Sequence, residues 1–234
     1  MLRVEDGGRP KTPQAVFDRV APYYDTLNSI LSLGIDRRWR RRAIRSLNLR
    51  SGERVLDVAT GTGALACEIV RATSGTVSVT GCDLNEPMLS VARRRGSRAG
   101  FPIEFVCCDA QQLPFGRESF DAVTIAFAID DMVDRHACIA EIWRVLRSAG
   151  RFALLELSQP DEQPAKAAYQ AYLKTFRLFG RGYRHLEQEI LKYRGVDAIR
   201  SLVNGAGFTG YECENLTWGI ARLHTAEKPS PART

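Results

Sequence analysis

The sequence predicts an α/β fold: an open, doubly wound sheet of seven strands with helices on both faces. Short apolar runs alternate with helical stretches from residue 54 onward, which is typical of parallel strands joined by crossover helices. A glycine-containing turn at residues 57–63 follows the first of these runs. Two β-rich runs near the C-terminal end have no helix between them, which favours an antiparallel pair at the sheet edge.

Length and composition indicate a globular chain with one domain. It has 234 residues, 44% hydrophobic and 26% charged, which excludes a disordered or fibrous class. The chain has 33 Lys and Arg residues and 27 Asp and Glu residues, which gives a net charge of +6. This positive charge is compatible with an anionic partner. We predict one domain over residues 12–226, between disordered tails at 1–11 and 227–234.

The cysteines and the N-terminal residues indicate the cellular compartment of the protein. The six cysteines show no CxxC or Cys/His zinc spacing, so we expect reduced thiols in a cytoplasmic protein. The N-terminus lacks the apolar core of a signal peptide, and no apolar run approaches the roughly 20 residues that cross a bilayer. We therefore expect neither a targeting segment nor a membrane-spanning helix.

Residues 12–50 are predicted to form a helical lid, with Thr12 as a cap. The second helical stretch places Trp39, Ile44 and Leu47 on one side. Arginines surround them: Arg37, Arg38, Arg40, Arg41, Arg42 and Arg45. Such a helix fits a surface that rests on anionic lipid, or an ordinary solvated face. No nucleic-acid recognition motif accompanies the charge, so we predict no nucleic-acid partner.

Strands and helices then alternate along the chain. We predict strands at 54–58, 77–83, 103–107, 120–127, 151–157, 208–213 and 216–223. Helices are predicted at 64–72, after Asn85, at 135–146 and at 197–204. The stretch 160–193 is predicted to be a helical cover. Its aromatic residues, with Trp218, line either a hydrophobic tunnel or the core: Tyr169, Tyr172, Phe176, Phe179 and Tyr183.

Acidic residues follow three consecutive predicted strands. Gly61 and Gly63 let a ligand approach the backbone at the first strand-to-helix turn, a pattern that also fits a dinucleotide site. Asp57 at this turn would repel a pyrophosphate but favours a ligand with an ammonium and a sulfonium group. Asp83 is placed to accept a hydrogen bond from a ribose hydroxyl. After the third strand, Asp109 and the amide of Ala110 suit the amino edge of an adenine.

Motifs along most of the chain carry a family resemblance. They are Phe17-Asp18-Arg19-Val20-Ala21, Tyr24-Asp25-Thr26-Leu27-Asn28, Leu33-Gly34-Ile35-Asp36-Arg37-Arg38-Trp39-Arg40, Leu56-Asp57-Val58-Ala59-Thr60-Gly61-Thr62-Gly63, Gln111-Gln112-Leu113-Pro114-Phe115 and Leu216-Thr217-Trp218-Gly219-Ile220 with His224. Over residues 16–228 the chain resembles the ubiquinone/menaquinone biosynthesis C-methyltransferase family. The resemblance implies a class I Rossmann-like fold, S-adenosylmethionine as cofactor and a prenylated quinol as substrate.

The resemblance also implies roles for individual residues. Thr62, Asp83, Asp109 and Ala110 would contact the cofactor, and Tyr24, with Asp25, lies in the N-terminal segment that closes over it. The predicted cofactor site therefore consists of seven residues: Asp57, Gly61, Thr62, Gly63, Asp83, Asp109 and Ala110. Leu223-His224 near the end of the last strand approaches the reacting ring or is structural.

The chain departs from the family after the fourth strand. Where the family usually has Ser-Phe-Gly-Leu-Arg-Asn, this sequence has Ala126-Phe127-Ala128-Ile129-Asp130-Asp131. An acid pair in place of Arg-Asn reverses the charge, so stabilisation of a quinol oxyanion is not carried over. Methyl transfer to a ring carbon needs loss of a phenolic proton. We take Asp130, Asp131 and Tyr24 as candidate catalytic residues, and His136 as a further base.

Three other functions compete with ring C-methylation of a quinone. The related rhodoquinone biosynthesis proteins replace a methoxy by an amino group with S-adenosylmethionine and a metal ion. Only that alternative calls for a divalent metal, which the acids and histidine of 130–136 would hold; otherwise we predict none. The second is a diverged natural-product C-methyltransferase. A component that binds cofactor or quinone without turnover is the third, and the sequence leaves the oligomeric state open.

Overall fold

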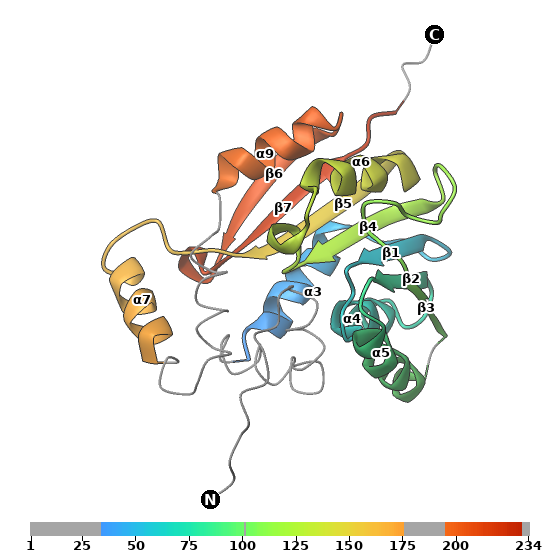
Figure 1. Ribbon diagram of the computed structural model, residues 1–234, viewed down its shortest axis with the longest axis horizontal. Helices are drawn as coiled ribbons and strands as arrows, with labels where there is room; N and C mark the ends of the chain where they lie inside the picture. Colours follow the sequence, from blue (N-terminus) through green and yellow to red (C-terminus); the bar gives the residue numbers. More distant parts are fainter. Residues whose placement is uncertain (1–33, 101, 176–194, 231–234) are drawn as a thin grey trace, which may run out of the picture.

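The computed structural model describes residues 34–100, 102–175 and 195–230, and its centre is a single seven-stranded sheet (Figure 1). The strands follow the spatial order β3-β2-β1-β4-β5-β7-β6. Their bounds are β1 Arg54–Val58, β2 Ser78–Asp83, β3 Ile103–Cys107, β4 Phe120–Ala126, β5 Leu146–Leu157, β6 Thr209–Leu216 and β7 Ala221–Glu227. The first five strands pair in parallel, and β7 is antiparallel to both β5 and β6. The predicted fold class is confirmed.

Helices cover both faces of the sheet. α3 (Asp36–Ser46), α4 (Ala64–Ala72) and α5 (Glu86–Ala99) lie on one side, and α6 (Arg135–Val145) and α9 (Val196–Gly205) on the other (Figure 1). β1 is buried on both faces, and its alternate side chains join different cores: Val55 packs with Trp39 and Leu65, and Leu56 with the α6 and α9 side. Local signals set two helix starts, since Asn85 accepts from the Met88 amide at 2.8 Å and Asp134 from that of Ala137 at 3.0 Å.

The last strand begins and ends later than predicted. Residues 217–219 form a short 3-10 turn, η3 (Thr217–Gly219), so β7 starts at Ala221. Its pairing with β5 continues to Glu227, opposite Arg151. Lys228 is then buried, and its Nζ donates to the carbonyls of Trp143 and Leu146 at 3.0 and 2.7 Å. The predicted tail therefore does not start at residue 227, because tertiary hydrogen bonds hold its first residues.

Two predicted helical segments are described only in part. α7 (Ala165–Thr175) occupies the first part of the predicted cover and lies beyond the carboxyl end of β5 (Figure 1). The rest of the cover, the predicted tail at 1–11, lid residues 12–33 and Tyr24 lie outside the described residues. Of the helices in the described part of the chain, none is long and apolar enough to span a bilayer.

Candidate active site

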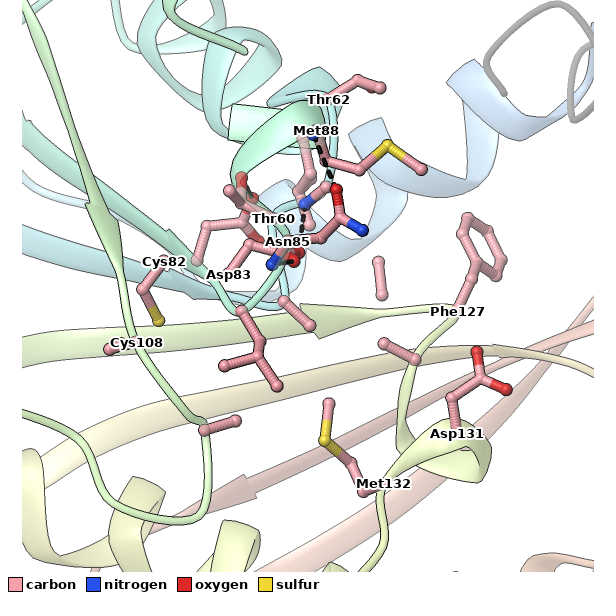
Figure 2. Close-up of a pocket in the computed structure, with 18 of the residues that line it drawn as sticks. Thr60, Thr62, Cys82, Asp83, Asn85, Met88, Cys108, Phe127, Asp131 and Met132 are labelled. Atoms are coloured by element: carbon pink, nitrogen blue, oxygen red, sulfur yellow. Dashed lines mark hydrogen bonds between the residues drawn. The ribbon is translucent and has the colours of Figure 1, made fainter. Parts of the chain in front are cut away.

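A cavity of about 250 Å³ opens at the carboxyl ends of β1 to β4, where the strand order reverses between β1 and β4. This is the position at which open α/β sheets bind ligands. Figure 2 shows Asp83 and Asn85 on one side of this cavity and Phe127, Asp131 and Met132 on the other. The cavity therefore has two ends, one beside the glycine turn and one beside the loop after β4.

The glycine turn shapes the first end. Gly63 has φ +73°, and a Cβ there would lie 3.0 Å from the Cβ of Ala92 and 3.1 Å from the Phe105 ring. The N-cap residue of α4 is Gly63, which has no side chain to cap the helix, and the N-terminal residues Ala64 and Leu65 line the cavity. The backbone amides at this N-terminus and the helix dipole thus suit an anionic group of a ligand. Of the residues predicted at this turn, Gly61 and Thr62 line the cavity, and Gly63 lies outside its lining as the N-cap of α4.

Asp57 lies at the base of the cavity and is 1% exposed. Thr60 and Thr124 donate to its two carboxylate oxygens at 2.6 and 2.7 Å. Burial nevertheless raises the pKa of Asp57 to about 6, because two hydroxyl donors do not replace the lost hydration. A cation placed in this cavity would favour the ionised form.

Asp83 and Asp109 complete the acidic set. Asp83 accepts from the backbone amides of Gly61 and Asn85, both at 2.8 Å, which fixes the glycine turn, and burial raises its pKa. Asp109 accepts from the amide of Gln111 at 2.8 Å and from its Nε2 at 3.0 Å. Both acids and Ala110 line the cavity. The structure therefore brings together the strand-end residues that the sequence predicted as a nucleoside site.

The second end separates the two candidate acids after β4. Asp131 lines the cavity with Phe127 and Met132. Asp130 is outside its lining and pairs with Arg135 at 3.1 Å. Consecutive residues of the short helix η1 (Ile129–Asp131) point in different directions, so one of them faces the cavity. His136 is exposed and outside the lining.

Two functional candidates escaped the sequence analysis. Arg40, predicted as part of a basic surface, lines the cavity, pairs with Asp36 and lies 5.8 Å from the Phe127 ring centre. The i,i+4 spacing of Asp36 and Arg40 was the available signal. Glu156 is buried behind η1 and accepts from the Ile129 amide at 3.3 Å. Burial, and then the nearby Asp130 charge, raise the pKa of Glu156 well above its ordinary value.

His224 is not among the residues that line the cavity at the ends of β1 to β4. It is 1% exposed on β7, and its Nδ1 lies 2.6 Å from the Tyr211 hydroxyl. Burial lowers its pKa to about 4, so the ring stays neutral. Of the two interpretations, the structure favours the structural one.

Metal ligands do not gather in the part of the chain described. No group of three or more His, Cys, Asp or Glu side chains there is arranged to hold a metal ion, and this includes the described residues 130–136.

Comparison with known proteins decides the family. The model of the ubiE/COQ5 methyltransferase family matches residues 7–228. The chain belongs to the ubiE/COQ5 methyltransferase family. It is 37% identical to the ubiquinone/menaquinone biosynthesis C-methyltransferase UbiE of Geotalea daltonii, over 92% of this chain and 95% of that protein. It is 36% identical to the demethylmenaquinone methyltransferase of Thermus thermophilus, over 92% and 100% of the two chains.

Solved structures agree on the fold of this ubiE/COQ5 protein. A SAM-dependent methyltransferase from Aquifex aeolicus superposes with a TM-score of 0.61 at 16% identity, over 81% of this chain and 89% of that one. The ubiE/COQ5 protein is thus a methyltransferase with the class I fold, and its methyl donor is S-adenosylmethionine. The dinucleotide interpretation of the glycine turn is wrong.

Proposed function

We propose that this ubiE/COQ5 protein methylates a ring carbon of a prenylated quinol, and that the cavity at the ends of β1 to β4 is where it does so. The observation that carries the proposal is the division of this cavity into an acidic end, with Asp57, Asp83 and Asp109, and an apolar end beside Phe127. Its curated relatives are named for ubiquinone and menaquinone biosynthesis and for demethylmenaquinone methylation.

The residues of the acidic end fit the cofactor. Asp57 would supply a buried carboxylate for its ammonium and sulfonium charges, and Asp83 would accept from its ribose. Asp109 and Ala110 would hold the adenine, while Arg40, Thr62 and the N-terminus of α4 would hold its carboxylate. Once bound there, S-adenosylmethionine supplies an electrophilic methyl group.

The apolar end beside Phe127 fits the acceptor ring. Phe127, Ala128 and Met132 are half-buried and provide apolar walls that shield the reacting atoms from water. Asp131 is the carboxylate at this end, and it takes the phenolic proton that makes the ring carbon nucleophilic. Asp130 and Glu156 do not line the cavity but hold η1 in place, Asp130 through Arg135 and Glu156 through the Ile129 amide.

A comparison of quinones from cells with and without the gene tests this proposal. C-methylation predicts quinones that are heavier by one methylene when the gene is present, as measured by mass spectrometry. Exchange of a methoxy for an amino group would establish the rhodoquinone-type reaction instead. Unchanged quinones, together with tight S-adenosylmethionine binding to the pure protein, would indicate a binding component.

We further propose that α3 rests on an anionic membrane surface. Arg37, Arg38, Arg41 and Arg45 are exposed on this helix, and clustered arginines attract anionic lipid. Trp39 of the same helix turns inward beside Phe127, which lines the cavity. Contact with lipid at α3 would bring an apolar substrate close to the reaction site.

A further inference from the structure

A second cavity of about 470 Å³ lies between α3, α7 and η3. Its described lining is almost wholly aliphatic and aromatic: Ile35, Trp39, Pro160, Pro164, Ala165, Ala168, Tyr169, Tyr172, Thr217, Trp218 and Ile220. No charged side chain is among these described residues. Trp39 Nε1 donates to Thr217 Oγ1 at 2.8 Å, so two polar atoms of the wall satisfy each other. This mostly apolar lining suits an uncharged, flexible hydrocarbon better than a charged ligand.

The apolar cavity adjoins the reaction cavity through one pair of rings. Trp39 lines the apolar cavity and Phe127 lines the reaction cavity, with ring centres 6.4 Å apart. Phe127 and Asp131 lie on the same side of the reaction cavity, with the Asp131 carboxylate pointing toward Phe127 (Figure 2). The rings of Trp39 and Phe127 separate the cavities, so a ring bound beside Phe127 has the apolar cavity as its neighbour on the other side of Trp39.

Trp218 stands at this cavity in an unfavourable conformation. Its φ is 55° and that of Thr217 is 48°, a region that glycine prefers, and the side chain is 81% exposed. The surrounding bonds hold the turn, since Ser158 donates from its amide to the Ile220 carbonyl and from its hydroxyl to that of Gly219. Backbone strain that is maintained around an exposed apolar side chain is typical of a ligand contact.

We infer that the cavity between α3, α7 and η3 binds the hydrocarbon chain of the acceptor, with Trp218 as the residue that covers the chain at its entrance. This inference rests on the proposed function for the identity of the ring. The cavity makes chain-bearing acceptors better substrates than the bare ring, because only the chain buries apolar surface there. Residues of the cavity between α3, α7 and η3, which lie outside the reaction cavity, thus select the substrate by its chain.

Two variants and one matched control test the inference. Trp218→Gly removes the side chain and relieves the positive φ, which offsets the conformational entropy that glycine adds to the unfolded chain, so we expect the variant to fold. Ala168→Phe fills the cavity from α7. Ala167→Phe is the control, since Ala167 is exposed on the same helix and does not line the cavity.

The assay compares methyl transfer to a naphthoquinol without a side chain and to the same ring with a farnesyl chain. We expect Trp218→Gly and Ala168→Phe to lower kcat/KM for the farnesyl substrate by about tenfold or more, and to change the bare ring less than about twofold. Ala167→Phe should change neither. An equal loss on both substrates, or no loss on either, would overturn the inference.

A calorimetric titration with farnesol separates failure of the inference from failure of the proposed function. If neither these naphthoquinols nor the corresponding benzoquinols are methylated, the proposed function is wrong, and farnesol binding alone decides the role of the cavity. Binding that Ala168→Phe abolishes and Ala167→Phe preserves would support a hydrocarbon site. Absence of binding, or binding that is insensitive to Ala168→Phe, would overturn it.

Discussion

At the scale of residues, the buried carboxyl of Asp57 links cofactor binding to pH. Its pKa of about 6 in the folded protein lies above the ordinary 3.8. Between these values the unfolded chain has released this proton and the folded chain still holds it, so Asp57 makes the free energy of unfolding fall as pH rises from about 4 to about 6. A cationic ligand reverses the preference, because it stabilises the ionised form.

We therefore expect S-adenosylmethionine to bind roughly tenfold more weakly at pH 5 than at pH 7, as calorimetry in matched buffers would measure. Asp57→Asn should weaken binding at pH 7 and remove most of this dependence. Asp197→Asn, at a residue whose side chain is 93% exposed, serves as the control and should behave like the wild type. A wild-type affinity that does not vary with pH would refute the role of Asp57.

The two acids of η1 are expected to separate in kinetics. Asp131→Asn should lower kcat by about a hundredfold and leave S-adenosylmethionine affinity unchanged, since it removes a proton acceptor at the reacting end. Asp130→Asn should instead lower the melting temperature, because Arg135 loses the carboxylate with which it forms an ion pair. Steady-state kinetics and thermal unfolding of both variants check this assignment. Equal kcat for Asp131→Asn and wild type would exclude Asp131 as the base.

At the scale of elements, Lys228 joins the end of β7 to the junction of α6 and β5. Its Nζ donates to two carbonyls and lies 4.0 Å from the centre of the Trp143 ring. Lys228→Met would leave these buried carbonyls without that donor, so we expect the free energy of unfolding to fall by about 2 kcal/mol. Urea unfolding measures this, with Lys166→Met on α7 as the control. A loss no larger than the control's would contradict the structural role of Lys228.

At the scale of the whole molecule, the exposed arginines of α3 predict salt-sensitive binding to anionic vesicles. Reversing Arg38 and Arg45 to Glu should weaken flotation with phosphatidylserine vesicles by about tenfold or more at low salt. Arg94→Glu with Arg98→Glu, on exposed residues of α5, changes the net charge equally and should have a much smaller effect. Equal effects of the two pairs would show that net charge, and not the α3 face, governs the interaction.

The sequence by itself determined the sheet and the acidic end of the site. Short β-rich runs mark β1, β2 and β4 closely, because parallel strands that are largely buried on both faces leave a local signature. Asp57, Asp83 and Asp109 follow from the same pattern, since residues at the carboxyl ends of neighbouring parallel strands meet at one edge.

Only the tertiary structure decided which neighbours of these residues face the cavity. Arg40 and Asp131 line it while Asp130 turns to Arg135, a choice set by the packing of α3 and η1 against the sheet. The end of β7 and the placement of Thr217 likewise depend on partners more than 60 residues away, such as Arg151 and Trp39. These contacts cannot be predicted from local sequence, because they join residues that are brought together only when the sheet assembles.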